Sequence, residues 1–133
     1  MCIRDRIIDR VKTEDAIPYW DYDAPVTKET PRDVSAASVT ASAMIELSTM
    51  VPDGQKYLDY AEKILKSLSS DAYLAKVGDN QGFILMHSVG SLPNGSEIDT
   101  PLNYADYYYL EALKRFMELK KLRVENGELR VIQ

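Results

Sequence analysis

A helical stretch with almost no charge is the feature that most constrains how this 133-residue chain folds. Residues 32–50 follow Pro31, place Asp33 where it can cap a helix, and are rich in alanine and serine. No charged residue lies between Asp33 and Glu46. Because so thin and smooth a surface lets neighbouring helices approach closely, we predict an interior helix with partners on several sides.

The next helical pattern is of a different kind. In residues 55–69 the apolar side chains recur at a period of 3.6 residues and form one stripe, whereas charged side chains occupy the other face. The turn Pro52-Asp53-Gly54 separates the two patterns. We therefore predict an antiparallel helical hairpin with a buried inner helix and a half-exposed outer helix.

The rest of the chain predicts one more long helix, reached through a long loop. The helix is expected over residues 104–122, with Asp106 in its first turn, where the helix dipole favours a negative charge. The apolar run 83–86 predicts a short strand or a buried extended segment. Residues 87–103 then form a polar loop whose length is typical of functional or disordered loops, and its own apolar anchors favour an ordered one.

The two ends of the chain carry little pattern. Residues 1–6 have no apolar signal-peptide core and no helical period that joins them to the residues after them. We expect residues 1–7 to be a non-native leader, with an ordinary charged N-terminus as the alternative. Residues 123–133 are expected to form a tail, in which 129–132 is either frayed or a small strand. Localisation is left open between a bacterial periplasm and cytoplasm.

Composition excludes several classes of function. One cysteine and one histidine exclude an intramolecular disulfide framework and a multi-histidine metal site. A net charge of −5 argues against non-specific nucleic-acid binding. No apolar run approaches the ~20 residues that cross a membrane, and no phosphate loop, zinc motif or dinucleotide fingerprint occurs. We expect no metal, cofactor, nucleic-acid partner or membrane partner.

The segment Ile17–Pro25 is the first candidate for a binding site. Three aromatic and two acidic side chains occupy residues 19–23, and prolines lie on either side. Aromatic faces stack on the C–H surfaces of sugars and carboxylates accept hydrogen bonds from hydroxyl groups. Trp20 and Asp21 are therefore candidate sugar-binding residues, and the alternative is an aromatic plug beneath a loop.

The lone histidine, His87, is the second candidate, at the start of the long loop. One interpretation is a half-buried histidine that holds the loop by hydrogen bonds. The other is a ligand-binding or proton-handling group, because histidine titrates near neutrality. The residue types of a Ser-His-Asp triad are present without a Gly-x-Ser-x-Gly elbow, and two acids two residues apart do not define a glycosidic acid–base pair.

Four motifs in order resemble the unsaturated glucuronyl hydrolases of glycoside hydrolase family 88. The segment 17–25 resembles their PYWDF-x-AP segment, and residues 32–37 resemble the helix start RDxSAAA. Residues 83–90 followed by Pro93 resemble the HSVGxxP loop, and residues 96–113 resemble SExDxPLxYADYYFLEAL. The resemblance covers about residues 8–121.

The resemblance implies an all-α fold, the (α/α)6 barrel of six helical hairpins. Twelve helices of ~12 residues with connections of ~5 residues need at least ~200 residues. We therefore expect residues 8–122 to be the C-terminal portion of such a barrel, which is incomplete in this chain.

The resemblance also implies an activity. Family members remove unsaturated glucuronic acid from the non-reducing end of oligosaccharides that polysaccharide lyases produce, by hydration of the C4–C5 double bond. Their two catalytic aspartates lie upstream of the matching segment, so we expect no catalytic residue here and no activity of the chain alone. The expected substrates of the whole protein are glycosaminoglycan-type or related unsaturated oligosaccharides.

The resemblance implies that the loop from His87 through Ser96 corresponds to the region that, in some family members, contacts the sugar next to the scissile bond. This correspondence adds four candidate substrate-binding residues, which are Ser88, Ser91, Asn94 and Ser96. The lysine that members with a preference for sulfated substrates carry in this loop is absent. Two alternatives stay open, an unsaturated rhamnogalacturonyl hydrolase and a non-enzymatic helical interaction module.

Overall fold

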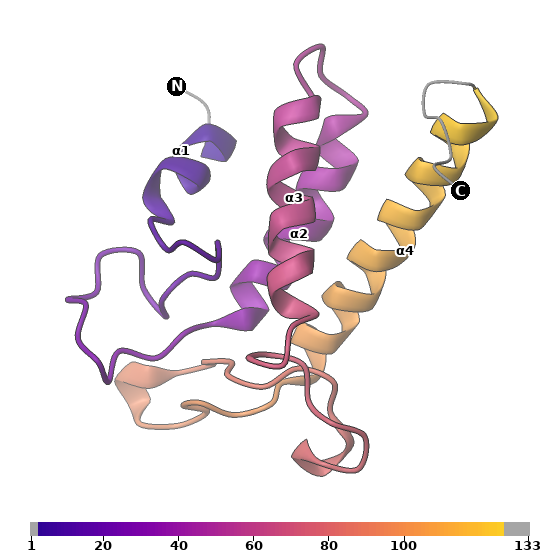
Figure 1. The fold of residues 1–133 in the computed structure, drawn as a ribbon. Coiled ribbons are helices and arrows are strands. Elements are labelled where there is room, and N and C mark those ends of the chain that lie inside the picture. The colour runs from indigo at the N-terminus through magenta and orange to yellow at the C-terminus, as the bar shows by residue number, and fades with distance from the viewer. Residues whose placement is uncertain (1–2, 127–133) are drawn as a thin grey trace.

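The computed structural model describes residues 3–126, and their side chains from residue 5 onward (Figure 1). The helices are α1 (Ile3–Arg10), α2 (Val34–Ser48), α3 (Gln55–Leu68) and α4 (Asn103–Glu125), and η1 (Asn80–Gly82) and η2 (Leu92–Asn94) are single 3₁₀ turns. Extended pairing within residues 3–126 is limited to isolated bridges. The all-α prediction is confirmed.

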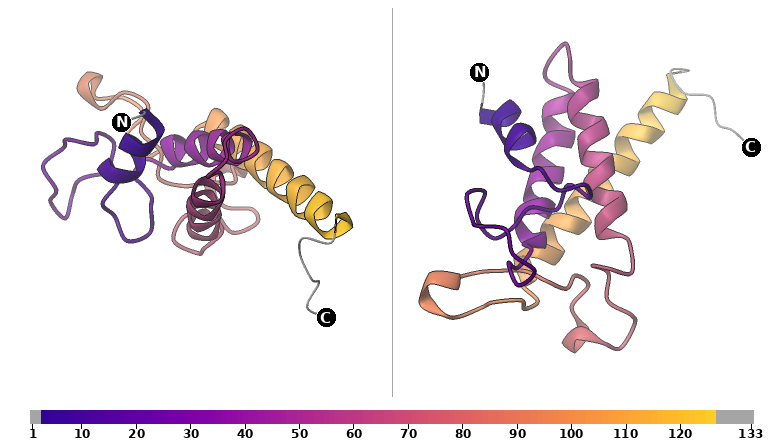
Figure 2. Two further views of the ribbon diagram at one scale, coloured as in Figure 1. Left: turned by 90° about the horizontal axis from the view of Figure 1, so that it is seen from above. Right: turned by 60° about the vertical axis from the view of Figure 1, so that its left-hand side comes forward.

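Helix α2 lies at the centre of the molecule. It packs against α3 on one side and α4 on another, whereas α3 and α4 hardly touch each other (Figure 2). Small side chains make these close approaches feasible, since Ala37, Ala41 and Ser42 are buried. The inner–outer hairpin of α2 and α3 is confirmed. A third face of α2 is open, and Val39 on that face is 40% exposed.

The N-terminus of α2 joins the helix to two loops. As predicted, Asp33 is the N-cap, and its Oδ1 accepts hydrogen bonds from Ser35 N at 3.0 Å and Ser35 Oγ at 2.6 Å. The same oxygen accepts from Val89 N at 3.3 Å, and Val34 N donates to His87 O at 3.1 Å. The start of the central helix therefore fixes the start of the long loop.

Helix α1 corrects the expectation that no helical pattern connects residues 1–6 to the next residues of the chain. It runs through this boundary, and its side chains Ile7 and Ile8 pack against the core. Tyr57 on α3 donates its hydroxyl hydrogen bond to Asp5 Oδ1 at 2.7 Å. An eight-residue helix owes its stability to such tertiary contacts, which a sequence period does not reveal. The leader hypothesis itself stays a prediction.

Helix α4 begins and ends close to the predicted limits and anchors the segment before the long loop. Asp106 lies in its first turn as expected, and its carboxylate accepts hydrogen bonds from Ile84 N at 2.8 Å and Leu85 N at 2.9 Å. Residues 83–86 are extended as predicted, with Leu85 completely buried and the other three residues half-buried. The possible strand at 129–132 lies outside the described residues.

The Asp33 cap gives the first testable prediction. We expect Asp33→Ala to lower the free energy of unfolding by about 1–2 kcal/mol, because the first turn of α2 and the amide of Val89 lose their acceptor. Urea unfolding followed by circular dichroism measures the change. Asp71→Ala, at an exposed position, is the matched control and should stay within about 0.5 kcal/mol of the parent chain. Equal effects of the two substitutions would contradict the capping role.

Candidate functional site

Both segments singled out from the sequence lie at one end of the helices. The loop 11–33 and the connections 69–102 gather where α2 and α4 begin and α3 ends (Figure 1). The helices therefore act as a frame that brings together loops distant in sequence. Two of the cavities among these loops contain residues that the sequence analysis singled out.

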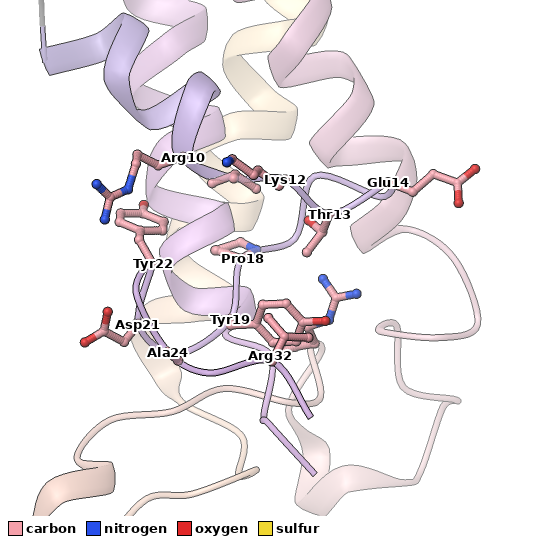
Figure 3. Close-up of a pocket in the computed structure, with 12 residues that line it drawn as sticks. Arg10, Lys12, Thr13, Glu14, Pro18, Tyr19, Asp21, Tyr22, Ala24 and Arg32 are labelled. Atoms are coloured by element: carbon pink, nitrogen blue, oxygen red, sulfur yellow. The ribbon is translucent and has the colours of Figure 1, made fainter. Parts of the chain in front are cut away.

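The first cavity, here called the N-terminal cavity, has a volume of about 360 Å³. It lies between the end of α1 and the loop after it, with Tyr19 and Tyr22 on its wall (Figure 3). Its charged lining residues are of both signs, namely Arg10, Lys12, Glu14, Asp21 and Arg32. Aromatic faces beside hydrogen-bonding groups make this cavity chemically suited to a polar ligand with C–H surfaces.

Asp15 is the centre of the hydrogen bonding behind this cavity. Its Oδ1 accepts from Ile17 N at 3.1 Å and from Arg32 Nη1 at 3.1 Å, and its Oδ2 accepts from Tyr73 Oη at 2.6 Å. Arg32 also donates to Ile17 O and stacks on Tyr19, with its guanidinium carbon 4.5 Å from the ring centroid. One carboxylate thus fixes a neighbouring backbone amide and two side chains that are distant in sequence, Arg32 and Tyr73.

These contacts alter the ionisation of Asp15 and Tyr73. Burial alone would raise the pKa of Asp15, but hydrogen bonds from Tyr73 and Ile17, together with the charge of Arg32, outweigh it and lower that pKa. Burial and the neighbouring Asp15 carboxylate raise the pKa of Tyr73. Tyr73 therefore stays a hydrogen-bond donor to Asp15 at neutral pH.

The second cavity, here called the hairpin cavity, has a volume of about 630 Å³. One wall is a hairpin-like loop over residues 88–100, paired at Ser88–Thr100 and Ser91–Ser96 and closed by the 3₁₀ turn η2 with Gly95 in the left-handed conformation. His87 stands at the base of this loop, and its Nδ1 lies 2.5 Å from Asp99 Oδ1. Arg32 lines both cavities.

The predicted site residues divide between these places. Asp21 lines the N-terminal cavity and His87 the hairpin cavity, whereas Trp20 is half-buried with its amide bonded to Pro31 O at 3.0 Å. The remaining four predicted residues belong to the hairpin loop, namely Ser88, Ser91, Asn94 and Ser96. Neither they nor Trp20 line the two cavities, and the complete burial of Ser88 goes against its predicted sugar contact. In the segment 17–25, Tyr19 and Trp20 are half-buried and Tyr22 is 43% exposed, so its aromatic side chains do not form a fully buried plug.

The Ser-His-Asp triad is not assembled at His87. Its acidic partner is present as Asp99, but the adjacent Ser88 is buried, and its hydroxyl has no hydrogen-bond partner among the described residues. Within residues 3–126, no three acidic, cysteine or histidine side chains gather in a way that could hold a metal ion. No helix in this part of the chain is both long and apolar enough to cross a membrane.

Sequence reasoning missed four residues that shape the site, namely Asp15, Arg32, Tyr73 and Asp99. Arg32 and Asp99 lie inside matched motifs, and this signal could have suggested a role for them. Asp15 and Tyr73 are 58 positions apart, and no local pattern links them. Their contact depends on how the loops fold back on the helices.

Comparison with solved structures places this arrangement in a class. One solved structure is described as an unsaturated glucuronyl hydrolase specific for heparin, and its sequence is 61% identical to this chain. The two superpose with a TM-score of 0.86 over 90% of this chain and 32% of the solved chain. The unsaturated glucuronyl hydrolase of Bacillus sp. GL1, described as responsible for the degradation of glycosaminoglycan, is 28% identical with a TM-score of 0.76, covering 94% of this chain and 32% of its own. The fold and the loop end are therefore those of a helical-barrel glycoside hydrolase.

Curated sequences name the family within this class. The unsaturated glucuronyl hydrolase of Formosa agariphila is 48% identical over 106 residues, which are 80% of this chain and 26% of the relative. An unsaturated chondroitin disaccharide hydrolase of Streptococcus pyogenes is 32% identical to this chain, and the match covers 77% of this chain and 27% of the relative's length. No family model matches the chain. By sequence and structure the chain is a relative of the unsaturated glucuronyl hydrolases, and it spans about 30% of their length.

The lowered pKa of Asp15 gives a pH-dependent prediction. A carboxylate whose pKa is lower in the folded state stabilises that state above its ordinary pKa of 3.8, and this contribution is lost as the pH falls through the lower folded value. We expect Asp15→Asn to destabilise the chain by about 1–2 kcal/mol at neutral pH. The difference from the parent chain should shrink below pH 3.8.

Urea unfolding at several pH values measures this difference. The matched control is Glu14→Gln, at the exposed neighbouring position, which should show no such pH-dependent loss. A destabilisation by Asp15→Asn that is the same at acidic and neutral pH would contradict the proposed charge contribution.

Proposed function

We propose that this chain forms one wall of the saccharide cleft of an unsaturated glucuronyl hydrolase. The whole protein then removes unsaturated glucuronic acid from the non-reducing end of lyase-generated oligosaccharides. The observation that carries the proposal is the 61% identity and 0.86 TM-score to a hydrolase described as specific for heparin. Heparin-derived unsaturated disaccharides are therefore the first substrates to test.

The two cavities support a role in substrate binding rather than in bond cleavage. Both lie at the loop end, and their walls offer aromatic faces, hydroxyl groups and an imidazole to a saccharide. We assign substrate contacts to Trp20 and Asp21 on one side and to His87, Ser91, Asn94 and Ser96 on the other. Ser88 is left out of this assignment, because its side chain is completely buried. In this proposal the catalytic aspartates belong to the part of the hydrolase that the chain does not match.

The names of the relatives favour this function over the two alternatives. They include glucuronyl and chondroitin disaccharide hydrolases, which supports a glucuronyl rather than a rhamnogalacturonyl substrate. A separate interaction module would use α2 and the aromatic segment as a binding face. The open face of α2 is explained more simply by a further helix of the barrel, because its exposed residues Val39 and Ala43 are apolar and Glu46, near the end of the helix, is its one charged residue.

A graft into an active relative tests the proposed function. We expect the heparin-specific hydrolase to keep its activity within about tenfold when residues 8–121 of this chain replace its aligned segment. The loss of ultraviolet absorbance from the conjugated double bond of heparin-derived disaccharides measures the rate. The 133-residue chain by itself should show no turnover.

The outcome also separates the alternatives. The graft counts as folded if its circular dichroism and its elution volume match those of the parent hydrolase. A folded graft that cleaves none of the lyase-derived disaccharides would overturn the proposed function and favour the interaction module. Within an active graft, Asn94→Ala should raise KM about threefold to tenfold, as expected for one lost hydrogen bond. The control Lys114→Ala changes an exposed residue on α4 and should leave KM unchanged.

A further inference from the structure

The pair formed by His87 and Asp99 is held in an unusual backbone conformation. His87 has a φ of 69° and Asp99 a φ of 51°, in the left-handed region that residues other than glycine rarely adopt. Such conformations persist where the surrounding structure dictates them, and they are concentrated at functional sites. Here they turn both side chains toward each other at the base of the hairpin loop, 2.5 Å apart.

Contacts from three parts of the chain hold this geometry. Val34 N donates to His87 O at 3.1 Å, and the neighbouring residues Ser88 and Thr100 exchange two backbone hydrogen bonds of 3.1 and 3.0 Å. The ring of Tyr73 meets the imidazole edge-on, with centroids 6.2 Å apart and planes at 83°. Tyr73 is itself fixed by Asp15 at 2.6 Å. The imidazole is therefore oriented by α2, the hairpin loop and Tyr73 together.

The identity of the partner atom determines which hydrogen-bonding group the imidazole offers to a ligand. An ionised carboxylate accepts hydrogen bonds and donates none, so the Nδ1 that faces Asp99 carries the ring proton. In a neutral imidazole the other nitrogen, Nε2, is then an acceptor. No group among residues 5–126 hydrogen-bonds to Nε2, and the His87 side chain is 43% exposed where it lines the hairpin cavity.

We propose that Asp99 is a positioning residue that holds His87 in the Nδ1–H tautomer, so that Nε2 accepts a hydrogen bond from a saccharide hydroxyl in the hairpin cavity. The choice of a saccharide rests on the proposed function. The choice of a hydroxyl rests on the tautomer, because an acceptor nitrogen selects a donor group and not a carboxylate or sulfate oxygen. Lys28 lines the same cavity and can meet acidic groups of a ligand, whereas Arg32 is already paired with Asp15.

Nitrogen-15 NMR of the ligand-free chain tests the positioning role directly. His87 is the single histidine of the sequence, so one pair of ring nitrogen signals reports its tautomer. With the imidazole neutral, we expect Nδ1–H in the parent chain. In Asp99→Ala the signals should shift to the Nε2–H form that free imidazole side chains prefer. Nε2–H in the parent chain, or no shift in Asp99→Ala, would overturn the proposal.

Two further variants separate positioning from folding of the hairpin loop. Glu97→Ala is a matched control, since Glu97 is an acidic residue in the same loop with the same φ of 51°, and it should leave the Nδ1–H tautomer unchanged. Asp99→Asn keeps a carbonyl oxygen that can accept from Nδ1 and should retain much of the Nδ1–H form. A loss of Nδ1–H in Glu97→Ala as large as that in Asp99→Ala would overturn the assignment to Asp99.

Kinetics in the active graft test the ligand. We expect His87→Ala and Asp99→Ala to raise KM for heparin-derived disaccharides about fivefold with kcat little changed, because one binding hydrogen bond is lost. Glu97→Ala should match the unmodified graft. A normal KM in Asp99→Ala, together with the expected tautomer in the chain, would overturn the saccharide contact. An inactive graft with the expected tautomer would instead count against the proposed function alone.

Discussion

The first turn of α2 is the junction on which the rest of the structure depends. Asp33 N donates to Pro18 O at 2.9 Å, while its carboxylate accepts from the start of the helix and from Val89 N. The next amide, Val34 N, donates to His87 O. Helix N-termini leave amides without intrahelical partners, and here two loops distant in sequence satisfy those donors or share the capping group. Helix, aromatic segment and histidine loop are thereby fixed in one place.

Carboxylate side chains order the loop end by accepting hydrogen bonds that neighbouring strands would accept in a sheet. Extended segments here pair through isolated bridges, so their backbone groups need other partners. Asp106 accepts from two successive amides of the segment 83–86, and Asp15 accepts from Ile17 N, Arg32 and Tyr73. Each acid links segments that come from different parts of the chain. Some of the acidic residues therefore serve the architecture of the loops, a role that net charge alone does not indicate.

The relation to the glucuronyl hydrolases explains the uneven surface of α2. The chain aligns with about 30% of the length of its relatives, and α2 has helical neighbours on two sides within the described residues. Its third face is uncharged up to Glu46, and over that stretch it has the composition of a buried surface. In the proposed barrel, this face meets further helices, and the loop end forms part of a cleft whose bond-breaking groups lie elsewhere in the hydrolase.

The helices and their layers were determined by the sequence itself. The uncharged stretch, the 3.6-residue stripe and the Asp33 cap each follow from a local rule, and for that reason α2, α3 and α4 were predicted within a few residues. The four ordered motifs likewise identified the family, because they need only matching letters in the right order. Helix α1 was missed, since its stability comes from Ile7, Ile8 and the Tyr57–Asp5 contact rather than from a period.

Tertiary structure alone decided how the candidate site is built. Asp15 and Tyr73 are 58 residues apart, and the partner of His87 is twelve residues away on the opposite arm of a loop. Hydrogen bonds of this kind depend on where the loops return to the helix ends, and residue type gives no measure of that distance. The sequence could name an imidazole and a set of carboxylates, but the fold determined which of them meet and which nitrogen is left to face a ligand.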